Sequence, residues 1–249
     1  MLLPLRIAIA FLTIVPISLP EQLSAGQLAR STAFFPLAGW LMGGFLASAC
    51  WLFLLMPLPP LVAAVLLVAL AAWLSRGLHL DGLADLADGL GGSHEPGKRL
   101  AIMKDSATGA FGVIALVLLL AFKIACLAVL FDLGGEPLFL ALLAAPVMAR
   151  WAMASLAFRA KYPRESGTGH SFVGRVRGQD LFLAGLFLLP VLWWHWQAGL
   201  LIFVAALVPS FLLRLKATKA LGGITGDVLG AACELSEACS LLAVLVFFF

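Results

Sequence analysis

Residues 110–131 are AFGVIALVLLLAFKIACLAVLF, and Lys123 is the only charged side chain among them. A transmembrane helix needs about 20 apolar residues to cross the hydrocarbon core of a bilayer, so this stretch predicts a membrane span. The whole chain is similar in character: 63% of its 249 residues are hydrophobic, 12% are charged, and the mean hydropathy is +1.07. Soluble domains average about 45–50% apolar and about 25% charged residues. This composition excludes an ordinary soluble globule and a disordered chain.

Further apolar stretches lie on both sides of this one. Together they predict an all-α fold, a polytopic membrane helix bundle with about seven spans. The spans are expected at 31–56, 61–75, 110–131, 137–157, 181–194, 198–213 and 227–249. We find no internal repeat and no low-complexity linker, so we expect a single integral membrane domain over residues 1–249.

Residues 1–20 carry one basic residue and an apolar stretch, as a signal peptide does. They contain no small-x-small cleavage site, and Pro4, Pro16 and Pro20 interrupt them. We therefore expect a short N-terminal helix, amphipathic or half-inserted, that is retained in the protein. The side of the membrane on which it lies is left open.

Basic residues alternate between the connections of the predicted spans. The connections at 57–60, 132–136 and 194–198 contain no Lys or Arg, and the cluster of Trp193, Trp194 and Trp196 marks a membrane interface at the last of these. The other three connections hold twelve of the sixteen basic residues: Arg76, Lys98, Arg99, Lys104, Arg159, Lys161, Arg164, Arg175, Arg177, Arg214, Lys216 and Lys219. By the positive-inside rule these connections face the cytoplasm. This predicts cytoplasmic active-site loops at about 76–109, 159–180 and 214–227.

Charge and cysteine content narrow the choice of partners. The net charge of +3 is too small to suggest nucleic acid as a partner. The four cysteines lie in apolar surroundings and none forms a CxxC pair. We interpret them as small buried hydrophobic residues rather than as a disulfide framework or a zinc site.

The strongest candidate for chemistry is the stretch from Gly77 to Gly89. Asp81, Asp85 and Asp88 are spaced i, i+4 and i+7, which places them on one stripe of a helix. Three stacked carboxylates repel one another, and a bound Mg²⁺ would offset that repulsion, because Mg²⁺ prefers carboxylate and phosphate oxygens. The alternative is a solvated acidic end of a helix.

A second candidate, at 102–112, lies just before the long apolar span. Here Asp105 is either a further metal ligand or a general base, and Lys104 is a phosphate contact at a helix N-terminus. The alternative is that Asp105 or Ser106 caps the following helix.

A third candidate is the basic, glycine-containing loop at 161–172. Arg164 and backbone N–H groups there could bind phosphate, or the loop could be basic only because of its cytoplasmic location. A fourth lies at 219–234, where Asp227 and Glu234 share one helix face.

Two cations and one histidine in or beside apolar segments also call for an explanation. Ionisable residues inside a span are costly and usually face a polar interior. Lys123 could instead snorkel to the interface, and Arg150 could neutralise a carboxylate. His79 lies beside the aspartate cluster, where a lone histidine is more often structural than a ligand.

These motifs together are similar to those of the cobalamin synthase family, enzymatically adenosylcobinamide-GDP ribazoletransferase. The resemblance rests on His79-Leu80-Asp81-Gly82-Leu83-Ala84-Asp85 with Asp88-Gly89, on 102–112, and on 222–231. The stretches 35–39 and 162–169 fit as well. The resemblance covers almost the whole chain in the same order.

The resemblance implies a Mg²⁺-dependent, multi-pass enzyme of the bacterial cytoplasmic (inner) membrane. A ribose hydroxyl of α-ribazole, or of α-ribazole 5′-phosphate, attacks the cobinamide-bearing phosphorus of adenosylcobinamide-GDP. The products are adenosylcobalamin, or its 5′-phosphate, and GMP, late in the biosynthesis of vitamin B12.

Roles for individual residues follow from this chemistry. The pyrophosphate needs neutralising by metal and by Lys or Arg, and the attacking alcohol needs a base. The expected Mg²⁺ ligands are Asp81, Asp85 and Asp88, with Asp105 completing the site or acting as the base. Asp227 is a second candidate for metal or base, and Lys104 is also assigned to catalysis. Substrate and phosphate contacts are expected from His79, Lys104, Arg164, Lys219 and Thr225.

Two other functions compete with this one. The pattern Asp85-x-x-Asp88-Gly89 followed by Asp105 is faintly similar to membrane CDP-alcohol phosphotransferases acting on a lipid alcohol, but their Ala-Arg pair is missing. An ion-coupled transporter would use Asp85, Asp88 and Lys123 as relays, yet transporters usually show repeats. The oligomeric state is open, because Gly39, Gly43 and Ala47 could pack within one chain or between chains of a homo-oligomer.

Overall fold

The computed structural model describes residues 2–249, and this part of the chain is helical, with no strand. Two 3₁₀ turns, Thr32–Phe34 (η1) and Thr168–Ser171 (η2), complement the α-helices. The all-α prediction is confirmed. The helices are α1 (Leu2–Leu12), α2 (Ala25–Ser31), α3 (Phe35–Leu54), α4 (Pro60–Leu74), α5 (Leu78–Gly92), α6 (Pro96–Ile102), α7 (Ala110–Leu133), α8 (Gly135–Ala157), α9 (Gly178–Leu186), α10 (Leu189–Trp194), α11 (Trp196–Leu221) and α12 (Gly226–Phe248).

The number of spans differs from the expected seven. Within the described residues, five helices are long and apolar enough to cross a membrane: Ala25–Leu54, Ala110–Leu133, Gly135–Ala157, Trp196–Leu221 and Gly226–Phe248. A sixth span results if α4 and α5, which are bent by 90° relative to each other, are counted together as one. Helix α4 has 15 residues, about 22 Å at 1.5 Å per residue, which is short of the roughly 30 Å hydrocarbon core.

The segment at 181–194 is also not one continuous span. It divides into α9 and α10, because Pro190 has no N–H to donate to the Leu186 carbonyl. The Trp40 indole N–H donates to the Phe187 carbonyl at the break, at 2.8 Å. An indole from α3 thus supplies a hydrogen bond at the point where the helix ladder is interrupted.

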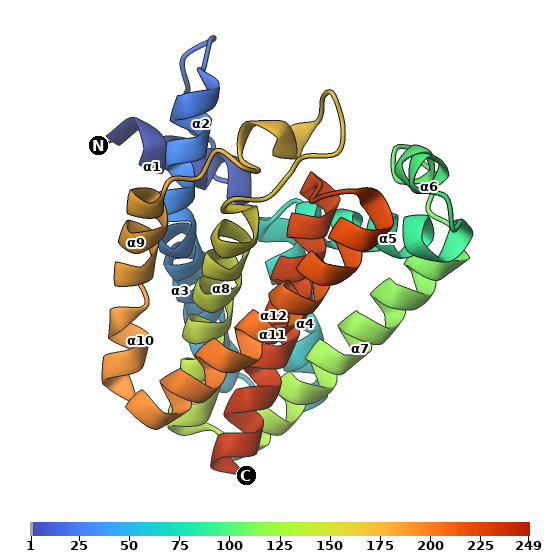
Figure 1. Ribbon diagram of the computed structural model, residues 1–249. Helices are drawn as coiled ribbons and strands as arrows, with labels where there is room; N and C mark the ends of the chain where they lie inside the picture. The colour runs from blue at the N-terminus through green and yellow to red at the C-terminus, as the bar shows by residue number, and fades with distance from the viewer. Residues whose placement is uncertain (1) are drawn as a thin grey trace.

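Helices α8 and α12 form the centre of the bundle (Figure 1). Helix α8 packs mainly against α3 and α12, and α12 packs against α8, α11 and α5. Gly39 and Gly43 let α3 approach α8 closely: a Cβ would lie 2.6 Å from the Pro146 carbonyl oxygen at Gly39 and 2.9 Å from that of Leu142 at Gly43. This part of the small-residue stripe therefore packs within one chain.

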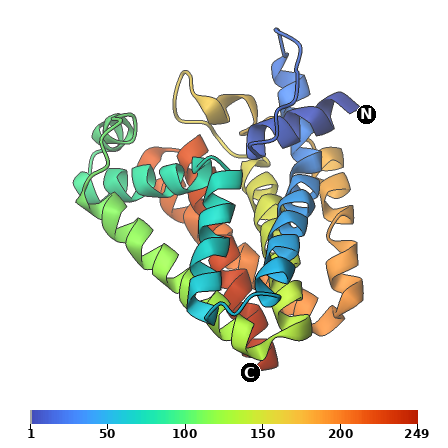
Figure 2. The ribbon, with the colours of Figure 1, turned by 180° about the vertical axis from the view of Figure 1, so that it is seen from behind.

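Helix α5 lies across one end of the bundle instead of continuing α4 (Figures 1 and 2). The turn between them uses left-handed backbone at Arg76 (φ 55°) and Gly77 (φ 67°). The Arg76 guanidinium donates to the carbonyls of Ala10 and Phe11 at 3.0 and 3.2 Å. The same residue therefore makes the turn and ties the end of α1 to it.

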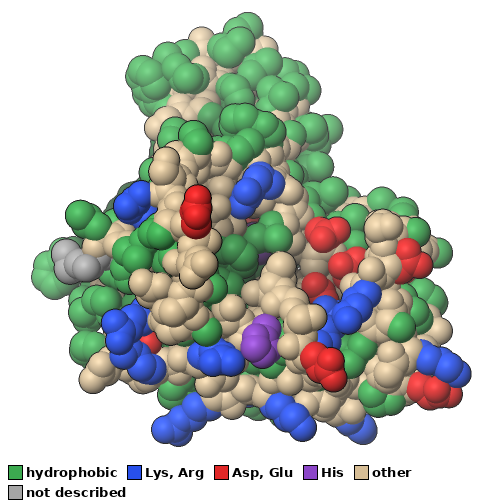
Figure 3. Space-filling model, turned by 90° about the horizontal axis from the view of Figure 1, so that it is seen from above, with side chains coloured by type: hydrophobic (Ala, Val, Ile, Leu, Met, Phe, Trp, Pro, Cys, Tyr) green, Lys and Arg blue, Asp and Glu red, His purple; other side chains and the backbone are tan. Residues whose placement is uncertain are grey.

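Charged side chains gather at the end of the molecule where α5 lies (Figure 3). Helices α1, α2 and α6 and the loops at 158–177 and 222–225 lie at this end, whereas the C-terminus lies at the other (Figure 1). The basic loops that we expected on one side of the membrane are thus at one end of the bundle. The N-terminal helix is on that side too.

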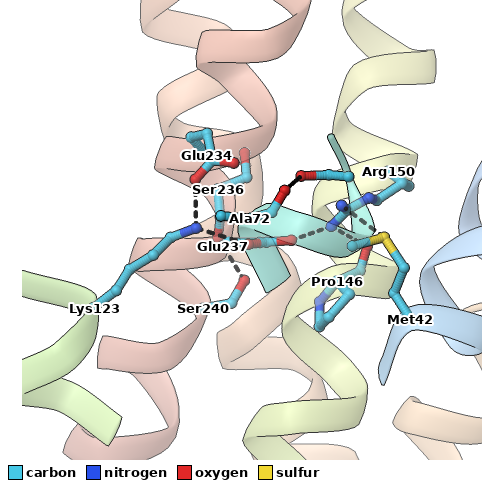
Figure 4. Close-up of polar contacts among 10 residues, drawn as sticks. Met42, Ala72, Lys123, Pro146, Arg150, Glu234, Ser236, Glu237 and Ser240 are labelled. Atoms are coloured by element: carbon cyan, nitrogen blue, oxygen red, sulfur yellow. Dashed lines mark hydrogen bonds and ion pairs between the residues drawn. The ribbon is translucent and has the colours of Figure 1, made fainter. Parts of the chain in front are cut away.

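An ion network occupies the bundle interior (Figure 4). Lys123 Nζ of α7 lies 2.5 Å from Glu234 Oε2 and 2.7 Å from Glu237 Oε2, both on α12, and Arg150 of α8 pairs with Glu237. All four side chains are buried, so Lys123 does not snorkel, whereas Arg150 does neutralise a carboxylate. Glu237 was not among the residues singled out from the sequence.

Candidate active site

A cavity of about 190 Å³ opens where α5 crosses the N-terminal end of α12. Its wall includes the aromatic residues Phe11, Phe35 and Phe172 and the polar residues His79, Asp81 and Asp227. Thr168 and Gly169 of η2 also line it. The cavity therefore joins three segments that the sequence analysis singled out separately: 77–89, 161–172 and 219–234.

Two glycines let α5 and α12 cross in close contact. A Cβ at Gly82 would lie 2.9 Å from the Asp227 carbonyl oxygen, and one at Gly230 would lie 3.1 Å from that of His79. Backbone atoms cannot yield as a flexible side chain can, so only glycine fits this crossing. The close packing brings Asp81 and Asp85 of α5 near Asp227 of α12.

The carboxylates of this crossing influence one another. Burial, followed by the charges of Asp81 and Asp227, raises the pKa of Asp85 to about 7. The Thr225 hydroxyl accepts a hydrogen bond from the Val228 N–H at 3.3 Å and donates one to Asp227 Oδ2 at 3.2 Å. Thr225 therefore caps α12 and holds Asp227, a more local role than the expected phosphate contact.

Among the described residues, Arg164 is the basic residue that forms an ion pair with a carboxylate of this crossing. Its Nη1 lies 3.0 Å from Asp227 Oδ2. Its Nε and Nη2 are buried and have no hydrogen-bond partner in the described chain. Buried guanidinium donors without partners are costly, so they are suited to receiving an anion.

The backbone explains why Arg164 reaches this place. The Ile224 N–H donates to the Lys161 carbonyl at 2.8 Å. Gly223 permits this contact, since a Cβ there would lie 2.2 Å from the same carbonyl oxygen. The loop that carries Arg164 is thus fixed to the turn that precedes Asp227.

His79 is only 1% exposed, and neither ring nitrogen has a hydrogen-bond partner among the described residues. Burial first, and then the positive charge of Arg150, lower its pKa to about 3. The imidazole is therefore neutral at pH 7. It cannot attract a phosphate as a cation would.

Asp88 makes contacts that were not expected from the sequence. Its Oδ2 accepts from the Gly109 N–H at 2.7 Å and its Oδ1 from the Gly112 N–H at 2.9 Å. The two carboxylate oxygens therefore accept hydrogen bonds from backbone N–H groups at the start of α7, whose N-cap residue is Gly109. The helix cap that we considered for Asp105 or Ser106 thus comes from Asp88 on α5.

Three other predicted residues lie apart from the cavity. Lys104, Asp105 and Lys219 are exposed and do not line it. Asp105 accepts a hydrogen bond from the Ala107 N–H at 3.1 Å within its own loop. Across residues 2–249, no three His, Cys, Asp or Glu side chains form a ready-made metal site, so a metal at Asp81 and Asp85 would need substrate oxygens as further ligands.

Comparison with known proteins decides the family. A family model described as cobalamin-5-phosphate synthase matches residues 4–245. The chain belongs to the cobalamin-5-phosphate synthase family. This confirms the resemblance found in the motifs, and the match spans α5, the Arg164 loop and α12.

Named relatives are similar over almost their full length. A protein of Syntrophobacter fumaroxidans is 43% identical over 95% of this chain and 95% of its own. A protein of Desulfitobacterium hafniense is 40% identical over 96% of this chain and 94% of its own. A protein of Acinetobacter baumannii is 38% identical over 99% of this chain and 98% of its own. Each is named adenosylcobinamide-GDP ribazoletransferase. No solved structure matches the chain.

Proposed function

We propose that this member of the cobalamin-5-phosphate synthase family is an adenosylcobinamide-GDP ribazoletransferase. A ribose hydroxyl of α-ribazole, or of α-ribazole 5′-phosphate, forms a bond to the cobinamide-bearing phosphorus of adenosylcobinamide-GDP. The bond from that phosphorus to the GMP oxygen breaks and GMP leaves. The observation that carries the proposal is the Arg164–Asp227 pair beside Asp81 and Asp85, in a chain similar throughout to relatives of that name.

Arg164 is the proposed phosphate ligand. Its two unpartnered nitrogens can donate to the oxygens of the reacting pyrophosphate, which would remove the cost of leaving them buried and unpaired. Asp227 lines the cavity and is the proposed base that accepts the proton of the ribose hydroxyl. The hydrogen bond from Thr225 holds that carboxylate in place.

The carboxylates on α5 fit a divalent cation. Burial and the charges of Asp81 and Asp227 make the ionised form of Asp85 unfavourable on its own, and a cation would relieve that repulsion. Asp81 and Asp85 would hold Mg²⁺ together with phosphate oxygens and water. When bound, Mg²⁺ supplies positive charge that stabilises the phosphoryl group and the leaving phosphate.

Lys104, Lys219 and Asp105 have a more distant role in this proposal. All three are exposed; Lys104 and Asp105 lie in the loop before α7, and Lys219 lies in the last turn of α11. The donor carries a corrin and a guanosine as well as a pyrophosphate and extends well beyond a cavity of about 190 Å³. We assign the two lysines to outlying anionic or polar parts of the donor, and Asp227 replaces Asp105 as the preferred base.

The proposed location is the bacterial cytoplasmic membrane, with the active site facing the cytoplasm. The basic loops gather at the end that contains the cavity, and the positive-inside rule assigns such loops to the cytoplasmic side. Nucleotide substrates are available on that side.

Product identification tests the proposal. The full chain is reconstituted in liposomes with adenosylcobinamide-GDP and Mg²⁺, and α-ribazole 5′-phosphate, α-ribazole or a long-chain lipid alcohol is added in separate reactions. Mass spectrometry should detect the cobalamin product only with a ribazole. A cobinamide phosphodiester of the lipid alcohol would favour the CDP-alcohol type of enzyme, and no product from folded protein would contradict the proposal.

A further inference from the structure

The cavity at the α5–α12 crossing has two kinds of wall. One side is aromatic and apolar: ring centroids lie 4.9 Å apart for Phe11–Phe172, 5.8 Å for Phe35–Phe172 and 6.2 Å for Phe11–Phe35. Met153 extends the same wall. The other side carries Asp81, Asp227 and Thr168. A phosphate site alone would not need the aromatic side.

A second observation also indicates a ligand. His79 lines this cavity, is almost completely buried, and has no hydrogen-bond partner at either ring nitrogen among the described residues. A buried polar group without a partner costs free energy in the empty site. A ligand that offers one hydrogen-bonding atom on an otherwise apolar surface would satisfy one of the two nitrogens and remove part of that cost.

We propose that this cavity binds the planar base of the acceptor nucleoside. Phe11, Phe35 and Phe172 pack against the ring of that base. The His79 imidazole forms a hydrogen bond with the ring nitrogen of the base that does not carry the sugar. The inference rests on the proposed function and adds to it the place and the residues that select the acceptor. An apolar cavity of about 150 Å³ is enough to bind benzene, so a cavity of about 190 Å³ admits a small fused ring.

The chemistry of the two available bases favours the acceptor. Ribazole is a riboside of a substituted benzimidazole, and one of its two ring nitrogens carries the sugar. It therefore presents one acceptor nitrogen and a largely apolar outline. Guanine, the base of the donor, presents several donors and acceptors around its edge. Against the aromatic side of the cavity, most of these would be left unsatisfied.

This placement also fits the proposed chemistry. With the base against the phenylalanines, the ribose would lie toward the polar side of the same cavity, where Asp227 is located. Arg164 is paired to that carboxylate and would hold the phosphate under attack. The hydroxyl, its base and the phosphate ligand are then next to one another, and binding the ring orients the hydroxyl.

Equilibrium binding of α-ribazole to the detergent-solubilised full chain, by calorimetry and without donor, tests the inference. Phe172→Leu should weaken binding about fivefold, because an aromatic stacking contact is lost. Phe45→Leu is the matched control, since Phe45 of α3 is 48% exposed on the outside of the bundle and should change nothing. KM for adenosylcobinamide-GDP should stay within about twofold in both variants.

An analogue tests the hydrogen bond from the ligand side. The corresponding indole riboside has CH in place of the free ring nitrogen and should bind the unaltered protein about tenfold more weakly than α-ribazole. In His79→Leu, α-ribazole and the analogue should bind equally. The comparison on the unaltered protein holds even if the variant fails to fold.

Three results would overturn the inference. Equal binding of the two ribosides to the unaltered protein would remove the role of His79. Unchanged α-ribazole binding in folded Phe172→Leu would remove the aromatic wall, and a loss of GDP binding in that variant would assign the cavity to the donor base. If any of these results is obtained while the unaltered protein still forms the cobalamin product, only the proposed location of the acceptor base is wrong. If the unaltered protein forms no product, the proposed function itself is contradicted.

Discussion

Arg164 Nη1 lies 3.0 Å from Asp227 Oδ2, and this contact joins the loop after α8 to the first turn of α12. The two residues are far apart in sequence and carry opposite charges. Two guanidinium nitrogens of Arg164 stay buried and have no partner among residues 2–249. The pair therefore resembles a site prepared for an anion more than a salt bridge that serves stability alone.

Replacing Asp227 tests its role as the base. Asp227→Asn keeps the size of the side chain and the cap from Thr225 to the Val228 N–H. We expect the turnover number to fall by about 10²–10⁴, as is typical when a general base is lost. Steady-state GMP release measures it, and Asp132→Asn, at an exposed residue in the last turn of α7 at the opposite end, is the control. Full activity of folded Asp227→Asn would exclude it as the base.

The fork geometry of Arg164 gives a second prediction. Lysine keeps the charge but cannot bond Asp227 and a phosphate oxygen with a planar fork. Arg164→Lys should raise KM for adenosylcobinamide-GDP by about tenfold or more, in line with the strength of charge-assisted hydrogen bonds. Arg30→Lys, on the exposed side of α2, should leave KM unchanged. Equal KM values for the two variants would remove Arg164 from the phosphate site.

Helix crossing gives a prediction with a close control. Gly82→Ala would place a Cβ 2.9 Å from the Asp227 carbonyl oxygen, whereas Gly44→Ala meets no atom within 4 Å. Both glycines lie within helices, where alanine is favoured by about 0.5–1 kcal/mol. Gly44→Ala should keep its activity and raise the melting temperature slightly, while Gly82→Ala should lose most activity. Activity assays and thermal unfolding in detergent compare them, and an active Gly82→Ala would show that the crossing can widen.

The proposed Mg²⁺ site at Asp85 should bind its metal in a pH-dependent way. Its pKa in the folded protein is about 7 against an ordinary value of 3.8, so the folded state holds this proton more tightly than the unfolded chain does. Without metal, the stability from this group is present at low pH and lost as pH rises through about 7. A metal that binds the carboxylate competes with the proton, so Mg²⁺ affinity should be about tenfold lower at pH 6 than at pH 8.

Thermal shift with Mg²⁺ at the two pH values measures this dependence. The larger rise in melting temperature should occur at pH 8. In Asp85→Asn the difference between pH 6 and pH 8 should disappear. A Mg²⁺ shift equal at both pH values in the unaltered protein would contradict a metal site at Asp85.

The ion network gives a prediction on stability. Lys123→Met leaves Glu234 with no ion pair and Glu237 with only Arg150 inside the bundle. Breaking a buried pair typically costs about 3–5 kcal/mol. The double variant Lys123→Met with Glu234→Gln should recover part of that loss. Chemical unfolding in detergent measures the difference, with exposed Lys216→Met as the control.

Long, uninterrupted apolar runs were predictable from the sequence because a bilayer imposes a length on them. Residues 110–131 and 137–157 became α7 and α8 with small changes at their ends. The segment at 61–75 was a helix but too short, and the turn after it depends on left-handed backbone at Arg76. No composition rule predicts that conformation at an arginine.

Residue types identified parts of the candidate site, but the contacts of each residue became visible only in the tertiary structure. Asp81 and Asp227 were singled out as carboxylates near apolar helices, and both line the cavity. Asp88 has the same spacing on α5, yet it is used by the backbone of α7. Phe11 and Phe172 gave no signal, because an aromatic wall assembled from α1 and a loop is visible only after folding.

Metal-dependent GMP release is the most direct measurement of the central claim, that Asp81, Asp85, Asp227 and Arg164 form the site of ribazole transfer. The unaltered protein and Asp81→Asn are reconstituted in liposomes and supplied with adenosylcobinamide-GDP and Mg²⁺, with and without α-ribazole 5′-phosphate and EDTA. We predict GMP release by the unaltered protein that requires the ribazole and stops with EDTA, and a loss of at least about 100-fold in Asp81→Asn. Equal release by the two proteins, or release unaffected by EDTA, would contradict the site described here.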